Sequence, residues 1–243
     1  MSLCREFCRF YLFIVGDDVR SLRRRLLPAL AVVAFSANGS DSGTAPANQP
    51  TRGWKQVPLK FQVQKPYDLQ LKDRYSYDAA SNTHDFWVFF TDKPHDPPPN
   101  KTTARTEMRL ESFREKERMF DADVNISPGT FACIAQVFDA AHGPVTMLIA
   151  HPDGSVTVGH DVIKTNAIGN WWNLKMTDDP HTNGPIHIYV NNVLVHTGHS
   201  RGPRDYYFKC GVYSRKNSDR SEARFRDIKV WEKPDSSAPE ETK

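Results

Sequence analysis

The sequence has few cysteines: four in 243 residues, of which Cys4 and Cys8 lie close to the N-terminus. No two cysteines have the Cys-x-x-Cys spacing, and the nine histidines are scattered along the chain. We therefore expect no metal site and no disulfide-rich scaffold. Cys133 and Cys210 are left as one possible disulfide. Both lie in strand-like runs whose alternation points them into the core, so two buried thiols are an equally good expectation.

Net positive charge is also lacking in most of the chain. The formal charge is +3, and residues 1–36 alone carry +3, so residues 37–243 are neutral. Binding to nucleic acid or to an anionic membrane needs a positive field. We therefore expect neither partner once the leader is removed. Any preference for an anionic ligand must come from locally arranged arginine and lysine side chains.

No apolar run is long enough to span a bilayer. The run 26–34 follows three arginines and precedes Ser36, a pattern typical of a secretory signal that is cleaved after about Ser36. This predicts a secreted, extracellular protein with a leader over residues 1–36. The stretch before the arginines is long for such a signal. A mis-assigned start or a non-secreted protein with a disordered leader would also explain it.

Amphipathic helical patterns are missing as well. Residues 111–120 permit a helix but are mostly charged. Residues 37–53 and 234–243 have the composition of a linker and a disordered tail, which leaves residues 54–233 as one folded domain. Within it, strand-length runs are separated by turn residues, for example at 151–154, at 182–185 and at Asn191-Asn192. The runs are 86–90, 105–110, 132–138, 145–150, 155–158, 171–176, 186–190, 207–213 and 223–231. Many short strands at this spacing predict an all-β sandwich or barrel.

One of these runs, 207–213, has a chemical face. As a strand it sets Lys209, Gly211 and Tyr213 on one side. A cation, a glycine that permits close approach and a phenol in one row are suited to a groove for an anionic ligand. A half-buried edge strand with solvated polar side chains would show the same pattern.

Two other runs carry polar residues of the same kind. Arg105, Glu107 and Arg109 alternate onto one face of their run, which fits either a binding surface or a solvated charged face. Gln136 stands in the otherwise apolar run 132–138. Its amide must find partners, either in the core or in a cleft.

Taken together, three motifs resemble those of polysaccharide lyase family 7, the alginate lyases. They are Arg-Thr-Glu-Met-Arg at 105–109, Gln-Val-Phe at 136–138 and Tyr-Phe-Lys-Cys-Gly-Val-Tyr at 207–213, in that order. The segment 185–192 ahead of the third motif is also similar to that family. The likeness runs from about Phe86 to Trp231, and in general plan it extends to the glucuronan lyases.

The resemblance implies a β-jelly roll, a concanavalin-like sandwich of two curved antiparallel sheets whose concave face binds an acidic polysaccharide. It implies cleavage of alginate or glucuronan by β-elimination, without a cofactor and in a monomer. Neutralising the sugar carboxylate is the main electrostatic task of such a site. By resemblance, Arg105 and Gln136 perform that task and Tyr213 donates the proton. The residues that shape the groove would be Glu107, Arg109, Lys209 and Phe138.

The chain departs from the family at Phe138. That position usually holds a histidine, which acts as the base, and a phenyl ring cannot accept a proton. Three explanations are open: Tyr213 serves as acid and base, a histidine enters from another loop, or the protein binds sugar without cutting it. The imported histidine would be His95, His84 or His142, and we take His95 as the catalytic candidate. Phe138 itself is suited to stack on a sugar ring. Glycoside hydrolysis is a weaker alternative because it needs two facing carboxylates, and only Glu107 lies on the proposed face.

Overall fold

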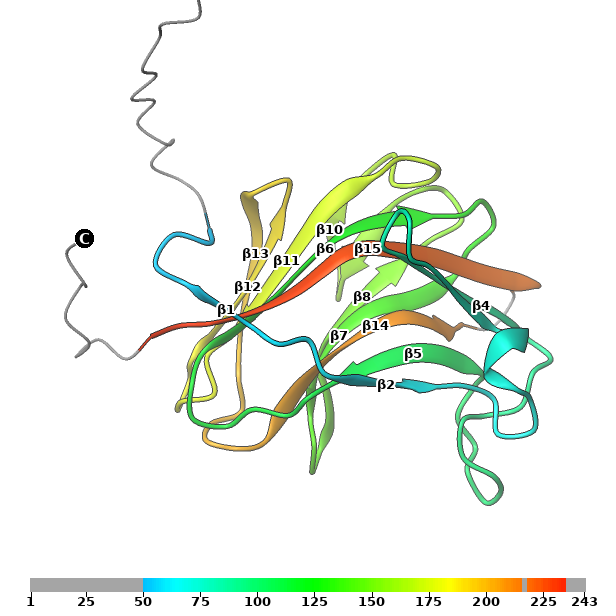
Figure 1. The fold of residues 1–243 in the computed structure, drawn as a ribbon, viewed down its shortest axis with the longest axis horizontal. Coiled ribbons are helices and arrows are strands. Elements are labelled where there is room, and N and C mark those ends of the chain that lie inside the picture. The colour runs from blue at the N-terminus through cyan, green and yellow to red at the C-terminus, as the bar shows by residue number, and fades with distance from the viewer. Residues whose placement is uncertain (1–49, 216–217, 235–243) are drawn as a thin grey trace, which may run out of the picture. The chain divides into compact units, whose positions relative to one another are not determined.

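The computed structural model describes residues 50–215 and 218–234, and these residues form a sandwich of two antiparallel sheets (Figure 1). The predicted leader, most of the predicted linker and the tail from residue 235 lie outside the described residues. The all-β prediction is confirmed. The described part of the chain contains one short 3-10 turn, η1 (Leu71–Asp73), and no helix that is long and apolar enough to cross a membrane.

The first sheet, which we call sheet A, has β15 near its centre, flanked by β6 and β4, while β1 pairs with β15 off the main path. Its strands, in spatial order, are β13 (Val193–His199), β12 (Pro185–Val190), β11 (Trp172–Asp178), β6 (Arg118–Ile126), β15 (Arg220–Glu232), β4 (Thr83–Phe89) and β3 (Tyr75–Asp78), with β1 (Lys55–Val57) at the side.

The second sheet, sheet B, has β14 between β7 and β5. Its strands, in spatial order, are β10 (Asp161–Lys164), β9 (Val156–Val158), β8 (Gly143–Ala150), β7 (Ala132–Asp139), β14 (Tyr206–Ser214), β5 (Arg105–Leu110) and β2 (Phe61–Gln64). The three motifs therefore occupy three adjacent strands, although they are far apart in the sequence.

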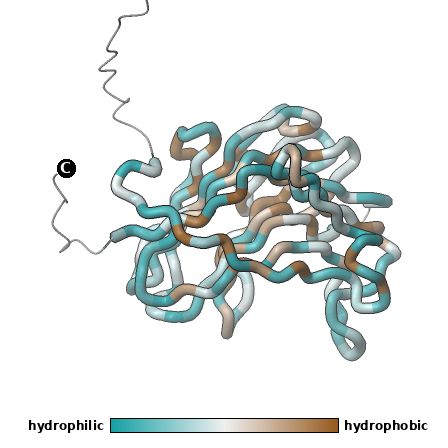
Figure 2. The backbone as a smooth tube through the Cα atoms, viewed as in Figure 1, coloured by the Kyte–Doolittle hydropathy of each residue, from teal (hydrophilic) through white to brown (hydrophobic). Residues whose placement is uncertain are grey.

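The core lies between the two sheets and is built by alternation. In β6, for example, Phe120, Ala122 and Val124 are fully or almost fully buried and belong to the hydrophobic core. Phe86 and Phe225 from the neighbouring strands meet edge to face, with ring centroids 5.9 Å apart. Figure 2 shows apolar segments interspersed with polar ones along the strands, as period-two alternation requires.

The strand β6 is the largest difference from the sequence prediction. Residues 111–120 permit a helix, but β6 begins at Arg118 and pairs with both β11 and β15. Apolar and polar residues alternate from Phe120 to Ile126, so the local sequence favours this strand as well. The predicted turn at Asn191-Asn192 is present: both residues have positive φ, 50° and 66°, and they connect β12 to β13.

The two cysteines of the domain are free and buried. Cys210 belongs to the hydrophobic core as predicted, but Cys133 does not. Cys133 pairs with Ile149 and Tyr213, and a register shift separates it from Ala135. Cys133 is fully buried as predicted, but this bulge reverses the alternation along β7, so Cys133 lies on the face of sheet B that carries Tyr213, outside the main apolar cluster. Burial raises the pKa of both thiols well above the usual value.

Asp178, at the end of β11, is a buried carboxyl. Its side chain is 0% exposed, and neither oxygen has a hydrogen-bond partner among the residues described. Burial, reinforced by the charges of Asp179 and Glu117, raises its pKa from 3.8 to about 8. The folded protein therefore keeps this proton at neutral pH, whereas the unfolded chain loses it.

We expect Asp178→Asn to flatten the pH dependence of stability. Between the unfolded and folded pKa values, the wild type loses stability as the pH rises, by up to about 3 kcal/mol from about pH 5 to about pH 7. The variant has no proton to lose at this position. Urea denaturation of both proteins at the two pH values measures the difference. If the free energy of unfolding changed equally with pH in the two proteins, the assignment of a neutral Asp178 would be contradicted.

Candidate active site

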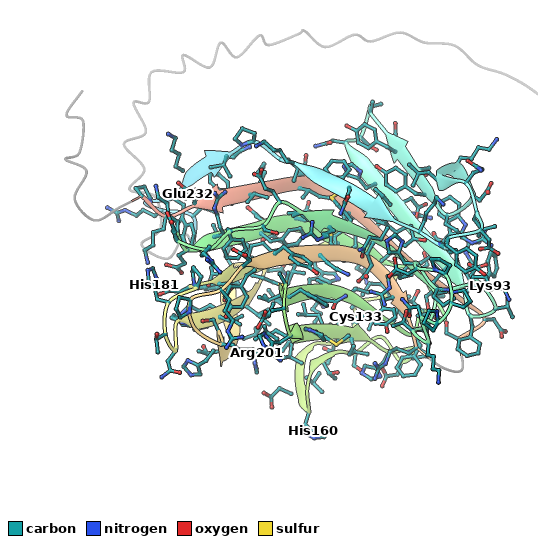
Figure 3. The ribbon with its side chains drawn as sticks, turned by 90° about the horizontal axis from the view of Figure 1, so that it is seen from below. Lys93, Cys133, His160, His181, Arg201 and Glu232 are labelled. Atoms are coloured by element: carbon teal, nitrogen blue, oxygen red, sulfur yellow. The ribbon has the colours of Figure 1, made fainter. Side chains whose placement is uncertain are left out.

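Sheet B places the three motifs on one face. Arg105 pairs with Tyr213, which pairs with Cys133 across the strands, and Arg109 pairs with Lys209, which pairs with Gln136. Directly paired residues of an antiparallel sheet share a face. The predicted residues Arg105, Glu107, Arg109, Gln136, Lys209 and Tyr213 therefore line one side of sheet B. Figure 3 shows Cys133 on the strands that carry this face.

Gly211 allows β14 and β5 to approach closely at this point. It lies opposite Glu107 and has a φ of 132°. A Cβ atom on Gly211 would lie 2.4 Å from the carbonyl oxygen of Thr106 and 2.8 Å from the Cα of Glu107. Only glycine fits such a position without a shift of the backbone.

The floor of the site is a buried polar cluster around Glu107. The Nε2 of Gln136 donates to one carboxylate oxygen, and the Nζ of Lys209 lies 3.4 Å from the other. Lys209 also donates to the Oε1 of Gln64 at 2.7 Å. The exposed fractions of the Glu107 and Lys209 side chains are 1% and 2%. Burial lowers the pKa of Lys209, and the charge of Glu107 opposes that shift.

Two arginine–tyrosine pairs lie beside this floor. The guanidinium carbon of Arg105 lies 4.0 Å from the ring centre of Tyr213, and that of Arg109 lies 4.1 Å from the ring centre of Tyr207. Stacking on an aromatic ring holds a guanidinium in a defined plane. Because Lys209 balances Glu107, these two arginines give the site a net positive charge. The Nε of Arg105 is buried and has no hydrogen-bond partner among the described residues.

Phe138 is stacked on Tyr207. The ring centres are 5.0 Å apart with an interplanar angle of 23°, and the Nζ of Lys209 lies 4.9 Å from the centre of the Phe138 ring. Phe138 thus belongs to the same face as the predicted groove residues. This position offers an aromatic surface and a cation, and no proton acceptor.

A protein-family model described as alginate lyase matches residues 54–232. The chain belongs to the alginate lyase family. The family resemblance that the three motifs indicate is thereby confirmed.

The known proteins that resemble this alginate lyase family member include a binding protein as well as lyases. A citrate-binding protein from Hevea brasiliensis is 29% identical over 191 residues, which cover 75% of this chain and 79% of the relative. Among solved structures, an alginate lyase from Corynebacterium sp. is 16% identical with a TM-score of 0.56, covering 70% of this chain and 92% of its own. A family 7 alginate lyase, solved with substrate after a histidine and a tyrosine were replaced, is 12% identical with a TM-score of 0.57 over 78% and 99% of the two chains. These likenesses confirm the predicted jelly-roll fold.

The three histidines proposed as an imported base lie in different environments. His84 lies in β4, is buried among Phe86 and other rings, and shares a 2.8 Å hydrogen bond with the hydroxyl of Tyr75. Burial lowers its pKa. The idea that His84 enters the cleft from a loop is therefore wrong, because His84 lies in β4 and its side chain is buried. His142 lies in the turn after β7 and contacts Asp139 and Arg204.

His95 contacts the residue that follows β2, the strand that carries Gln64 of the site. Its Nδ1 is 2.9 Å from the carbonyl oxygen of Lys65, which follows the end of β2, and its Nε2 is 3.7 Å from Asp96. The preceding residue Gln64 pairs with Glu107. No hydrogen bond in the described part of the chain joins His95 to Arg105 or Tyr213, and its catalytic role stays a prediction.

Sequence reasoning missed three residues of this site: Gln64, Cys133 and Tyr207. Tyr207 had a signal, because alternation sets it on the face of Lys209. Gln64 also had a signal, because apolar and polar residues alternate from Leu59 to Gln64, whereas Cys133 is displaced by a bulge. In the ranges 50–215 and 218–234, no three histidine, cysteine or acidic side chains gather where they could hold a metal ion.

Proposed function

We propose that this protein binds a uronic-acid polysaccharide, alginate or glucuronan, along sheet B and cleaves it by β-elimination. The observation that carries the proposal is the pairing of Arg105 with Tyr213, which puts a fixed cation and a phenol side by side. The family match supports the same reaction class. The predicted leader supports secretion, and a secreted protein would meet such polymers outside the cell.

The reaction needs a carboxylate holder and a proton carrier. Removal of the C5 proton puts charge onto a carboxylate that is already negative, and a preorganised guanidinium at Arg105 stabilises that charge. Tyr213, as a phenolate, takes the C5 proton and then gives it to the O4 leaving oxygen as the C4–O bond breaks. The proton is thus moved from carbon to oxygen, and a C4=C5 double bond forms.

The spacing of the two arginines favours a chain over a single small acid. Arg105 and Arg109 are four residues apart on one strand, so their Cα atoms are separated by about 13 Å. Each guanidinium is held by a different tyrosine. One small carboxylate cannot bridge that distance, whereas non-adjacent units of one polyuronate chain can present carboxylates to both.

We expect Tyr213→Phe to abolish turnover and leave binding largely intact, because it removes the proton carrier but keeps the ring under Arg105. The measurement is the ultraviolet absorbance of unsaturated products on alginate, polymannuronate, polyguluronate and glucuronan, with calorimetry for binding. Tyr189→Phe, the same chemical change in β12 of sheet A, is the matched control. A Tyr213→Phe variant with the wild-type rate would show that the proton carrier is another group.

A second candidate function is binding of carboxylates without cleavage. It is favoured by the Phe138–Tyr207 stack at the position of the usual base, and by a relative that is named a citrate-binding protein. This function predicts calorimetric heat with oligouronates or citrate and no rise in absorbance on any polymer. Wild-type turnover would exclude it.

A further inference from the structure

Residues 90–104 connect β4 to β5 and carry a motif that the proposed function does not use. The segment Asn100-Lys101-Thr102 has the pattern Asn-x-Thr, which is an acceptor pattern for N-linked glycans when x is not proline. The chain has three triplets of this kind, and the other two begin at Asn38 and Asn125. Because a three-residue pattern often arises by chance, the surroundings of each triplet decide whether it can carry a sugar.

The triplet at Asn125 has no room for a glycan. Asn125 lies in β6, is 8% exposed, and pairs with Arg224 of β15. The hydroxyl of Ser127, the third residue of the triplet, donates to Glu222 at 2.9 Å. A bulky, hydrated sugar on a strand that lies between two others would have to push its neighbours aside. The triplet at Asn38 lies outside the described residues.

Asn100 lies in an irregular segment at the surface. It is partly exposed, and both Lys101 and Thr102 are exposed. Three prolines precede it, at positions 97 to 99. Proline has no backbone N–H, so this segment can enter neither a helix nor the interior of a sheet. Figure 1 shows the connection from β4 to β5 as a loop that projects from the sandwich, so a group attached there points away from both sheets.

Both hydrogen bonds of the Asn100 side chain are compatible with a glycan. Its Oδ1 accepts from the backbone N–H of Thr102 at 2.8 Å, and its Nδ2 donates to the Oδ2 of Asp96 at 3.1 Å. A side-chain amide nitrogen carries two hydrogens, and N-glycosylation replaces one of them. The other hydrogen remains for Asp96, so the side chain keeps both contacts when a sugar is attached.

We propose that Asn100 carries an N-linked glycan, an inference that rests on the secretion expected from the predicted leader and not on the lyase reaction. In the attachment, Nδ2 of Asn100 forms a bond to C1 of the sugar as the bond between C1 and a lipid pyrophosphate carrier breaks. The carrier keeps the electron pair of that bond and the amide gives up one proton, so no oxidant or reductant is needed. A relative of this chain comes from Hevea brasiliensis, a eukaryote, and eukaryotic cells attach such glycans to secreted proteins.

The test is the mass of the full chain produced in cultured plant cells. Digestion of the secreted protein with a peptide N-glycosidase should lower its mass and convert the Asn100 side chain to a carboxylate, which is read by mass spectrometry of the peptide that contains it. Thr102→Ala should abolish this change at Asn100, because it removes the hydroxyl that the acceptor pattern requires. Thr102→Ser is the matched control at the same exposed position. It keeps a hydroxyl and should keep the glycan.

The outcomes separate this inference from the others. A secreted chain without sugar on Asn100, or with sugar on Asn125, overturns the inference and leaves the predicted secretion standing. A chain that stays in the cytosol overturns both. The wild-type peptide decides the question even if Thr102→Ala protein is not recovered. The lyase proposal is read separately, from the ultraviolet absorbance of the products.

Discussion

Phe138→His is expected to raise the rate of β-elimination by about 10²- to 10⁴-fold, the usual contribution of a positioned general base. The substitution puts an imidazole on the face that carries Gln136 and Lys209. Lys209 lies 4.9 Å from the present ring, and a neighbouring cation favours the neutral imidazole that can accept a proton. The rate is read from ultraviolet absorbance on the panel of uronate polymers.

Phe138→Asn is the matched control, because it removes the Phe138–Tyr207 stack without supplying a base. A Phe138→His protein that is no faster than this control would show that the rest of the site is not arranged for elimination. If the wild type is inactive and Phe138→His is active, the natural protein binds its ligand without cleaving it. Its site then lacks only the base.

Gly211→Ala should cost more stability than any other substitution suggested for this protein. The new Cβ would lie 2.4 Å and 2.8 Å from backbone atoms of β5, which cannot rotate away, and the φ of 132° is unfavourable for alanine. We expect a loss of at least about 3 kcal/mol in the free energy of unfolding. Urea denaturation measures this loss.

Gly198→Ala is the control for this experiment. A Cβ at Gly198 would come no closer than 3.7 Å to a neighbouring atom. We expect its unfolding free energy to stay within about 1 kcal/mol of the wild type. A Gly211→Ala protein as stable as this control would mean that β14 and β5 separate at little cost, which would remove the basis for the paired arrangement of Arg105 and Tyr213.

The sequence predicts the fold class, and it predicts that the residues of the three motifs share one face of a sheet. The strand β5 and its alternation are read correctly from Arg105, Glu107 and Arg109, because a regular strand has a fixed period of two. Cys133 is placed on the wrong face because a bulge adds one residue to the count, and nothing in the local composition announces it.

Other features could not be predicted because they arise from contacts between distant segments. In β6, apolar and polar residues alternate from Phe120 to Ile126, but the pairing of this strand with β11 and β15, which lie later in the chain, cannot be seen in the sequence. An open concavity at the edge of sheet B is lined by Val145 and Met147 of β8 and also by His196 and His199, which come from β13 of the other sheet. Period-two patterns say which way a side chain points within a strand, but not which edges of two sheets come together.

The two tyrosines under the arginines, Tyr207 and Tyr213, both belong to β14, whereas the residue at the position of the base, Phe138, belongs to β7. In the proposed reaction, Tyr213 of β14 both holds Arg105 and carries the proton, whereas the position of the family's usual base lies on β7. Under that proposal, a replacement at the β7 position changes the rate of elimination while β14 keeps its contacts with the arginines. A fold organised in this way can give rise to enzymes and to passive receptors of the same ligands without rebuilding its cationic surface.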